Sequence, residues 1–195
     1  MFAGMMLAAL LAVSAENLFF TGGMGFSRVL RAARSPRGTG MASAFVIIFS
    51  LFSAIEGFWL TPFFPSKGWA ALAVRPAALA GLLAVTYIVL AGVLKKSVPA
   101  FYEKNNRVLP LSAVNTAVLA IPYVQKAAGF SLLQSIGFAL GSGLSFLIAS
   151  ALLSCAIPVC NNPDMPKAFK GLPASLLYVG ILSMAFAGFT GGFTF

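Results

Sequence analysis

The chain has 195 residues, of which 59% are hydrophobic and only 9% are charged, and its formal net charge is +9. Soluble domains carry about a quarter charged residues, so this composition excludes a soluble fold. A span needs about 20 residues to cross roughly 30 Å of hydrocarbon, so the chain has room for six spans and for no soluble catalytic domain. We therefore expect a single all-α integral membrane domain over residues 1–195.

Six apolar runs, separated by connectors rich in Pro, Gly and basic residues, predict the transmembrane helices. In chain order they cover residues 1–22, 41–62, 72–94, 108–125, 131–155 and 172–194. The small residues Val13-Ser14-Ala15 in the first run resemble a signal-peptide cleavage site. No basic segment precedes that run, so we expect it to be retained as a span.

The first and fourth runs each contain an asparagine near helix-breaking residues. Asn17 stands shortly before Gly22-Gly23, and Asn115 shortly after Pro110. The two asparagines lie 98 positions apart, which is about half of the chain. Polar and helix-breaking residues at corresponding points of two halves predict an inverted repeat whose interrupted helices meet near the bilayer midplane. Helices 1 and 4 are therefore expected to be interrupted.

A second pair of similar segments supports the repeat. Pro76-Ala77-Ala78-Leu79 begins the third run, and Pro173-Ala174-Ser175-Leu176, 97 positions later, begins the sixth. Because three spans per half is an odd number, the second half must enter the membrane with the opposite orientation. We expect two inverted three-helix repeats, residues 1–97 and 98–195.

The basic residues are distributed unevenly between the two sides. Connectors after the first, third and fifth spans hold Arg28, Arg31, Arg34, Arg37, Lys95, Lys96, Lys104, Arg107, Lys167 and Lys170. The opposite connectors hold Lys67, Arg75 and Lys126. By the positive-inside rule the first set faces the cytoplasm, so both termini lie outside a bacterial or archaeal cytoplasmic (inner) membrane. This distribution explains the net charge without a nucleic-acid partner, which we do not predict.

The stretch from Arg28 to Arg37 has a second interpretation beside that of a topology signal. It could dock against a soluble acidic partner or against anionic lipid headgroups.

Acidic and polar residues inside the spans are candidates for an ion or electron path. An ionisable group within a span is costly and usually faces a cavity or a partner, which singles out Glu16 and Glu56. Glu56 could instead lie near the outer headgroups, where Trp59 and Trp69 would form an interfacial belt. Asn17, Asn115 and Thr116 have two open interpretations: they line a hydrated path, or they satisfy the interrupted backbone.

Two long segments resemble the A/E-type six-helix membrane subunits of Rnf and Nqr complexes. The run from Pro99 to Ala120 is similar to the family's SP-x-x-Y…LPL-x-x-TNCAVLG segment. Met165–Gly171, followed by Leu182–Gly191, is similar to its VP-x-x-F-x-G…LMSLAFMGFSG ending. The length and the external termini resemble the A-type subunits more than their oppositely oriented E-type partners.

The resemblance implies a subunit of an ion-motive electron-transfer complex. In such complexes electrons from ferredoxin or reduced nicotinamide pass toward flavin-bearing subunits while sodium ions or protons are pumped. Two related, oppositely oriented subunits jointly hold an iron–sulfur cluster through cysteines that follow the first break and occur in the TNC segment. This chain would be at most a non-catalytic subunit of such an oxidoreductase.

The chain departs from the family at the cysteine positions. The first falls at or near Ser27, and the second is Thr116; the only cysteines, Cys155 and Cys160, lie near the end of the fifth span. Iron–sulfur clusters are ordinarily held by thiolates, with His in Rieske centres, and the chain has no His. We expect no metal ligand and no cofactor in this chain, which would act as a scaffold or an ion path. Iron–sulfur and flavin groups would belong to partner subunits.

A six-helix solute-binding module, similar to the S-components of vitamin importers, is the alternative. The small residues Ala8 and Ala12 in the first span weakly resemble the docking stripe of those proteins.

Overall fold

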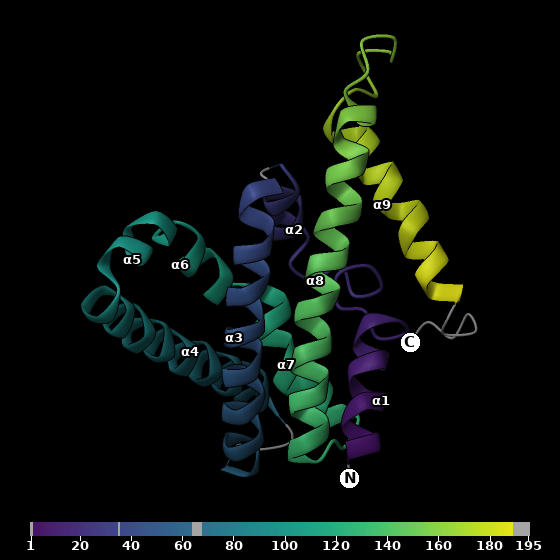
Figure 1. The fold of residues 1–195 in the computed structure, drawn as a ribbon. Coiled ribbons are helices and arrows are strands. Elements are labelled where there is room, and N and C mark those ends of the chain that lie inside the picture. The colour runs from purple at the N-terminus through teal and green to yellow at the C-terminus, as the bar shows by residue number, and fades with distance from the viewer. Residues whose placement is uncertain (1, 35, 64–67, 189–195) are drawn as a thin grey trace.

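The computed structural model describes residues 2–34, 36–63 and 68–188, which are helical with no strand (Figure 1). The α-helices are α1 (Phe2–Val13), α2 (Phe26–Ala33), α3 (Pro36–Leu60), α4 (Trp69–Ser97), α5 (Pro99–Asn105), α6 (Val108–Ala113), α7 (Thr116–Ala127), α8 (Leu132–Cys160) and α9 (Leu172–Ala187), and the short 3-10 helix η1 (Thr61–Phe63) follows α3.

Four apolar helical stretches among the described residues are long enough to cross a membrane. They are Thr39–Phe63, Ala73–Ser97, Val108–Ala127 and Leu132–Cys160, the third of which joins α6 and α7. α1 and α9 are apolar but have only 12 and 16 residues, fewer than the roughly 20 of a full span. The predicted class, an all-α multi-pass membrane protein, is therefore confirmed.

The long helices α3 and α8 form the centre of the molecule (Figure 1). α8 packs on both α1 and α3, and α7 packs on α3. The largest side chains buried between them are Phe49, Phe138 and Phe146. A Cβ at Gly137 would lie only 2.2 Å from the Met5 carbonyl oxygen, so this glycine lets the α1 backbone approach α8 closely. Close packing through small residues is a common way for membrane helices to associate.

α4 and α9 diverge from this centre (Figure 1). Their exposed side chains are large and apolar, such as Ile88 and Val89 on α4 and Ile181 and Met184 on α9. In a bilayer these faces contact lipid or other protein chains, because water does not reach them.

The helix boundaries differ from the sequence prediction in several places. α8 continues five residues beyond the predicted end at 155, and α3 begins five residues before the predicted start at 41. α2 is a helix inside the segment interpreted as a connector, and Arg75 lies within α4 and not in a connector. Residues 189–194 of the predicted last span lie outside the described residues. Hydropathy missed α2 because it is amphipathic and the first residues of α3 because they are polar.

Helical structure breaks off inside both the first and the fourth apolar run. The first run is helical only to Val13, and residues 14–25 form a series of turns before α2. In the fourth run α6 ends at Ala113 and α7 begins at Thr116, with Val114 and Asn115 between them. These two segments, the first break (14–25) and the second break (114–115), define the candidate site.

Candidate functional site at the paired helix breaks

Asn17 holds the first break together. Its side chain is fully buried. The amide Nδ2 donates to the Val13 carbonyl at 2.9 Å, and Oδ1 accepts from the backbone N–H groups of Phe19 and Phe20 at 3.1 and 3.2 Å. The Asn17 carbonyl accepts from the Thr21 hydroxyl at 2.6 Å. Asn17 thus supplies partners for backbone groups that a helix end leaves unpaired.

Asn115 plays a similar part at the second break. It is the N-cap residue of α7, its Oδ1 accepts from the Ala117 N–H at 3.2 Å, and its side chain is fully buried. An asparagine oxygen that accepts from the second N–H of a helix is a common N-cap arrangement. The amide Nδ2 of Asn115 has no hydrogen-bond partner among the described residues.

The two breaks contact each other directly. The backbone N–H of Gly25 donates to the Thr116 hydroxyl oxygen at 2.7 Å, across 91 residues of sequence. The Arg28 guanidinium donates to the Val114 carbonyl at 3.3 Å. Gly25 has φ +70°, and a Cβ there would lie 2.3 Å from Asn115 Oδ1. Only glycine fits at this junction, because it tolerates positive φ and brings no side chain.

Ser27 and Thr116 lie on the exposed side of this junction. Ser27 comes two residues after Gly25, whose N–H bonds to Thr116, so the fold brings the two positions near each other. Both offer neutral hydroxyl oxygens, and the Thr116 oxygen already accepts a hydrogen bond. Iron–sulfur clusters require thiolate ligands with occasional His, so these residues do not fit a cluster.

The two cysteines do not replace the missing ligands. Phe146 on α8 packs edge-on against Phe19 of the first break, with ring centroids 5.4 Å apart. Cys155 lies nine residues further along α8, about 13 Å along the helix axis at 1.5 Å per residue. Among the described residues there is no group of three or more His, Cys, Asp or Glu side chains that could hold a metal ion.

The two candidate acids lie in different surroundings. Glu16 stands beside Asn17, is partly buried, and its backbone N–H donates to the Leu11 carbonyl at 2.8 Å. Glu56 is also partly buried and accepts a short hydrogen bond from the Thr86 hydroxyl on α4. Its α3 neighbours Ser53 and Gly57 face α7. Glu56 therefore faces the α3–α4 contact and not the paired breaks.

Arg75 is a buried polar residue near the start of the apolar stretch of α4, and it was not predicted from the sequence. Its side chain is 7% exposed and donates to the Thr61 hydroxyl at 3.3 Å and the Pro122 carbonyl at 3.2 Å. The guanidinium carbon lies 4.7 Å from the centre of the Tyr123 ring, in cation–π range. An arginine within the apolar run that begins at 69 could have indicated a buried, hydrogen-bonded guanidinium. Pro76, which follows it, instead suggested that the helix begins after Arg75.

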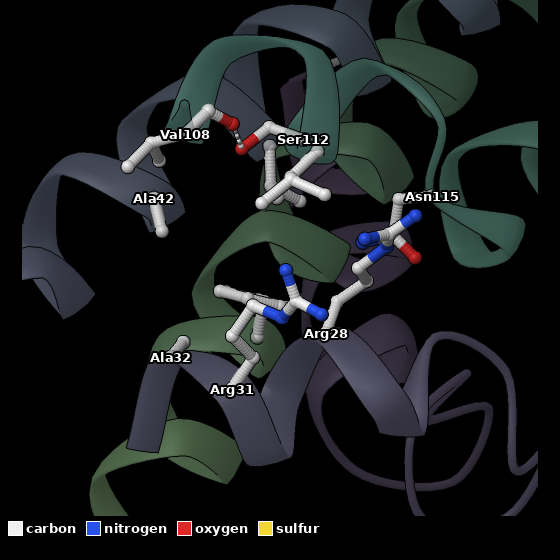
Figure 2. Close-up of a pocket in the computed structure, with 10 residues that line it drawn as sticks. Arg28, Arg31, Ala32, Ala42, Val108, Ser112 and Asn115 are labelled. Atoms are coloured by element: carbon white, nitrogen blue, oxygen red, sulfur yellow. Dashed lines mark hydrogen bonds between the residues drawn. The ribbon is translucent and has the colours of Figure 1, made fainter. Parts of the chain in front are cut away.

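A pocket of about 140 Å³ lies beside the second break, between α2, α3, α6 and α8. Figure 2 shows Arg28 and Arg31 on α2 at one side of it and Ser112 and Asn115 at the other. The Ser112 hydroxyl donates a hydrogen bond to the Val108 carbonyl at 3.0 Å. No local sequence pattern had predicted this pocket.

The chain is similar to known membrane proteins over nearly its whole length. Residues 5–192 match the family described as Rnf-Nqr subunit, membrane protein. The chain is 31% identical over 183 residues to the A-type subunit of the proton-translocating ferredoxin:NAD(+) oxidoreductase complex of Clostridium ljungdahlii, covering 92% of this chain and 93% of that protein. It is 32% identical over 174 residues to the A-type subunit of the ion-translocating oxidoreductase complex of an Azoarcus species, covering 88% of this chain and 87% of that protein. The resemblance found in the sequence is confirmed.

Proposed function

This chain belongs to the Rnf-Nqr family of membrane subunits, and on that premise we propose that it is the A-type subunit of an ion-translocating oxidoreductase complex. The match over residues 5–192 is the observation that carries the proposal. The C. ljungdahlii relative couples ferredoxin and NAD(+) to proton translocation, according to its name. We extend that class of reaction to the complex that contains this chain. Family membership also favours this function over the solute-importer alternative.

We propose that the chain is built from two inverted three-helix repeats, 1–97 and 98–195, that give six spans. Three features support this. α1 packs on α8 and α7 packs on α3, so each interrupted helix packs on the middle helix of the other half. α1 and α8 run in one direction in Figure 1, whereas α3, α7 and α9 run in the other. The side-chain oxygens of Asn17 and Asn115 both accept from the backbone N–H two residues further along the chain.

The orientation follows from the same repeat. Both termini lie outside a bacterial or archaeal cytoplasmic membrane in this proposal, with the basic connectors inside. The position of Arg75 within α4 removes one basic residue from the outer connectors, so the charge bias toward the inner side becomes stronger.

We further propose that the exposed junction at Ser27 and Thr116 faces a related, oppositely oriented subunit. The chain would support that interface without ligating a cluster, because it offers hydroxyls where thiolates are needed. Iron–sulfur and flavin groups would be carried by the other subunits of the complex.

The ion path is proposed to involve the polar groups within the spans, Glu16, Asn17, Glu56, Asn115 and Thr116. Glu56 is the strongest of these, since its carboxylate is partly buried and bonded to Thr86 inside a span. A carboxylate at such a depth can exchange a cation or a proton with a path. Asn17 is the weakest, because both ends of its side-chain amide are already hydrogen-bonded to the backbone.

The test is to express the chain with its genomic neighbours, purify the complex through a tag on this chain, and reconstitute it in vesicles. We expect co-purifying flavin-bearing subunits and ion uptake driven by ferredoxin or NADH oxidation. Deletion of this chain should abolish uptake. A chain that purifies without such subunits, while deletion leaves uptake unchanged, would overturn the proposal.

The absence of cluster ligands is tested on the same complex. Ser27→Ala and Thr116→Val, which each remove a hydroxyl, should leave the iron content per complex and the visible absorption unchanged. Loss of iron in either variant, with the subunits still assembled, would show that this chain holds the metal.

A further inference from the structure

The pocket beside the second break combines cationic and hydrogen-bond-donating groups with apolar walls. Arg28 and Arg31 come from α2, and Asn115 stands across from them (Figure 2). Val46 and Phe146 are among the apolar side chains that complete the walls. The chain's four acidic residues, Glu16, Glu56, Glu103 and Asp164, do not line it.

Asn115 contributes a buried amide to the wall of this pocket. Its Oδ1 is fixed by the Ala117 N–H and lies against Gly25, so the opposite branch of the amide is Nδ2. Nδ2 has two N–H groups and no partner among the described residues, although Asn115 is fully buried. Because Nδ2 itself has almost no accessible surface, the two arginines are the donors available to a ligand in the pocket.

The two arginines also have unused donors. A guanidinium carries five N–H groups. Arg28 donates one of its N–H groups to the Val114 carbonyl. Arg31 has no hydrogen-bond or ion-pair partner among the described residues. Two positive charges beside one pocket favour an anion with several acceptor oxygens, since arginine matches the geometry of phosphate.

We propose that this pocket binds a phosphate group, carried by an anionic phospholipid of the cytoplasmic leaflet or present as the free ion. Basic pockets between membrane helices on the cytoplasmic side are suited to lipid headgroups. In the proposed orientation the pocket extends toward that surface, since Val108, which lines it, directly follows Arg107 of the basic connector. The apolar side chains of Val46 and Phe146 would contact the glycerol and the first methylenes of the lipid.

The size of the pocket limits the ligand. Its 140 Å³ is the space of about five water molecules at roughly 30 Å³ each. Pockets for drug-sized ligands are about 300–1,000 Å³, so a flavin or a nucleotide would not be enclosed, whereas a phosphate with a short apolar extension would be.

The first arm of the test measures lipid. The purified chain is exchanged from phosphatidylglycerol nanodiscs into detergent, and retained phosphatidylglycerol is counted by native mass spectrometry. Arg28→Gln/Arg31→Gln should retain it at least about tenfold less, since each lost charge-assisted hydrogen bond is worth about tenfold or more in affinity. Asn115→Asp keeps the oxygen that caps α7 and adds a negative charge to the pocket wall, which repels a phosphate, so it should also retain less lipid.

The matched control is Arg34→Gln, which removes the same charge from an exposed residue at the end of α2 that does not line the pocket. It should retain lipid as the unmodified chain does. Size-exclusion profiles identify any variant that fails to fold, and Asn115→Asp remains as the second variant if the double arginine variant is lost.

The second arm titrates inorganic phosphate into the delipidated chain and follows the thermal unfolding midpoint. A ligand that binds the folded state raises that midpoint. Lipid retention that depends on the pocket residues identifies the phospholipid as the source. A phosphate-dependent midpoint that is lost only in the pocket variants identifies the free ion. If neither readout distinguishes the pocket variants from Arg34→Gln, the proposal is overturned. Both readouts measure binding alone, so they do not depend on the proposed electron-transfer function.

Discussion

The hydroxyl of Ser53 donates a 2.8 Å hydrogen bond to the carbonyl of Val118, which lies four residues before Pro122. Proline has no backbone N–H, so Pro122 leaves that carbonyl without its helical donor. Ser53 lies on the neighbouring helix α3, and its hydroxyl replaces the missing backbone donor. Unpaired backbone groups are costly in hydrocarbon, so this bond stabilises both the proline in α7 and the α3–α7 contact.

Ser53→Ala should destabilise the chain by about 1–3 kcal/mol, because it leaves a buried carbonyl unsatisfied. The free energy of unfolding is measured in detergent by titration with sodium dodecyl sulfate, followed by circular dichroism. The control is Ser154→Ala, since Ser154 is only partly buried and its hydroxyl bonds within α8, to the Ala151 carbonyl. We expect that control to change stability by less than about 0.5 kcal/mol; equal effects of the two substitutions would contradict the role given to Ser53.

Asn17→Ala should be more damaging, with a loss of about 2–4 kcal/mol, because the N–H groups of Phe19 and Phe20 both lose a buried acceptor. Asn161 provides the comparison. Its Nδ2 donates to the carbonyl four residues earlier, as that of Asn17 does, but Asn161 is exposed. Asn161→Ala should therefore be nearly neutral in the same unfolding assay. A neutral Asn17→Ala would show that the first break does not depend on this side chain.

Gly57→Ala should destabilise the chain by about 1–3 kcal/mol through overpacking. The added Cβ would lie 2.5 Å from Pro122 Cβ and 2.7 Å from Gln125 Nε2. Gly92, in the interior of α4, has nothing within 4 Å of the corresponding position. Gly92→Ala should be neutral or stabilising by up to about 1 kcal/mol, since alanine favours helix. Opposite signs for the two substitutions, measured by thermal unfolding, are the expected result.

Glu56→Gln tests the proposed ion path. The substitution removes the charge but keeps an oxygen that can accept the Thr86 hydrogen bond, so the complex should assemble normally. We expect ion uptake by reconstituted vesicles to fall by at least about tenfold, the scale of one lost general acid–base or cation-binding group.

The matched substitution is Glu103→Gln, which removes the same charge from an exposed residue of α5. It should leave uptake unchanged. Normal uptake by the Glu56→Gln complex would remove Glu56 from the path.

Much of the fold could be predicted from local sequence. Hydropathy located the apolar runs because the free energy of transferring a segment into lipid is approximately a sum over its residues. The second break was predicted at Asn115 because a polar residue follows Pro110 inside an apolar run, at a position that corresponds to Asn17 in the first half. α2 was missed, although Val29 and Ala33 are buried and Arg28 and Arg31 are less buried or exposed. That amphipathic spacing was present in the sequence, but the arginines were interpreted as a connector.

The sequence alone determined the membrane class, the order of the apolar runs and the two points where helices are interrupted, because these depend on residues that are neighbours in the chain. Only the tertiary structure decided that Gly25 bonds to Thr116 and that Arg28, Arg31 and Asn115 surround one pocket. Those contacts join residues more than 80 positions apart. They are fixed by how α2 and α7 pack around α3 and α8, which no local pattern encodes.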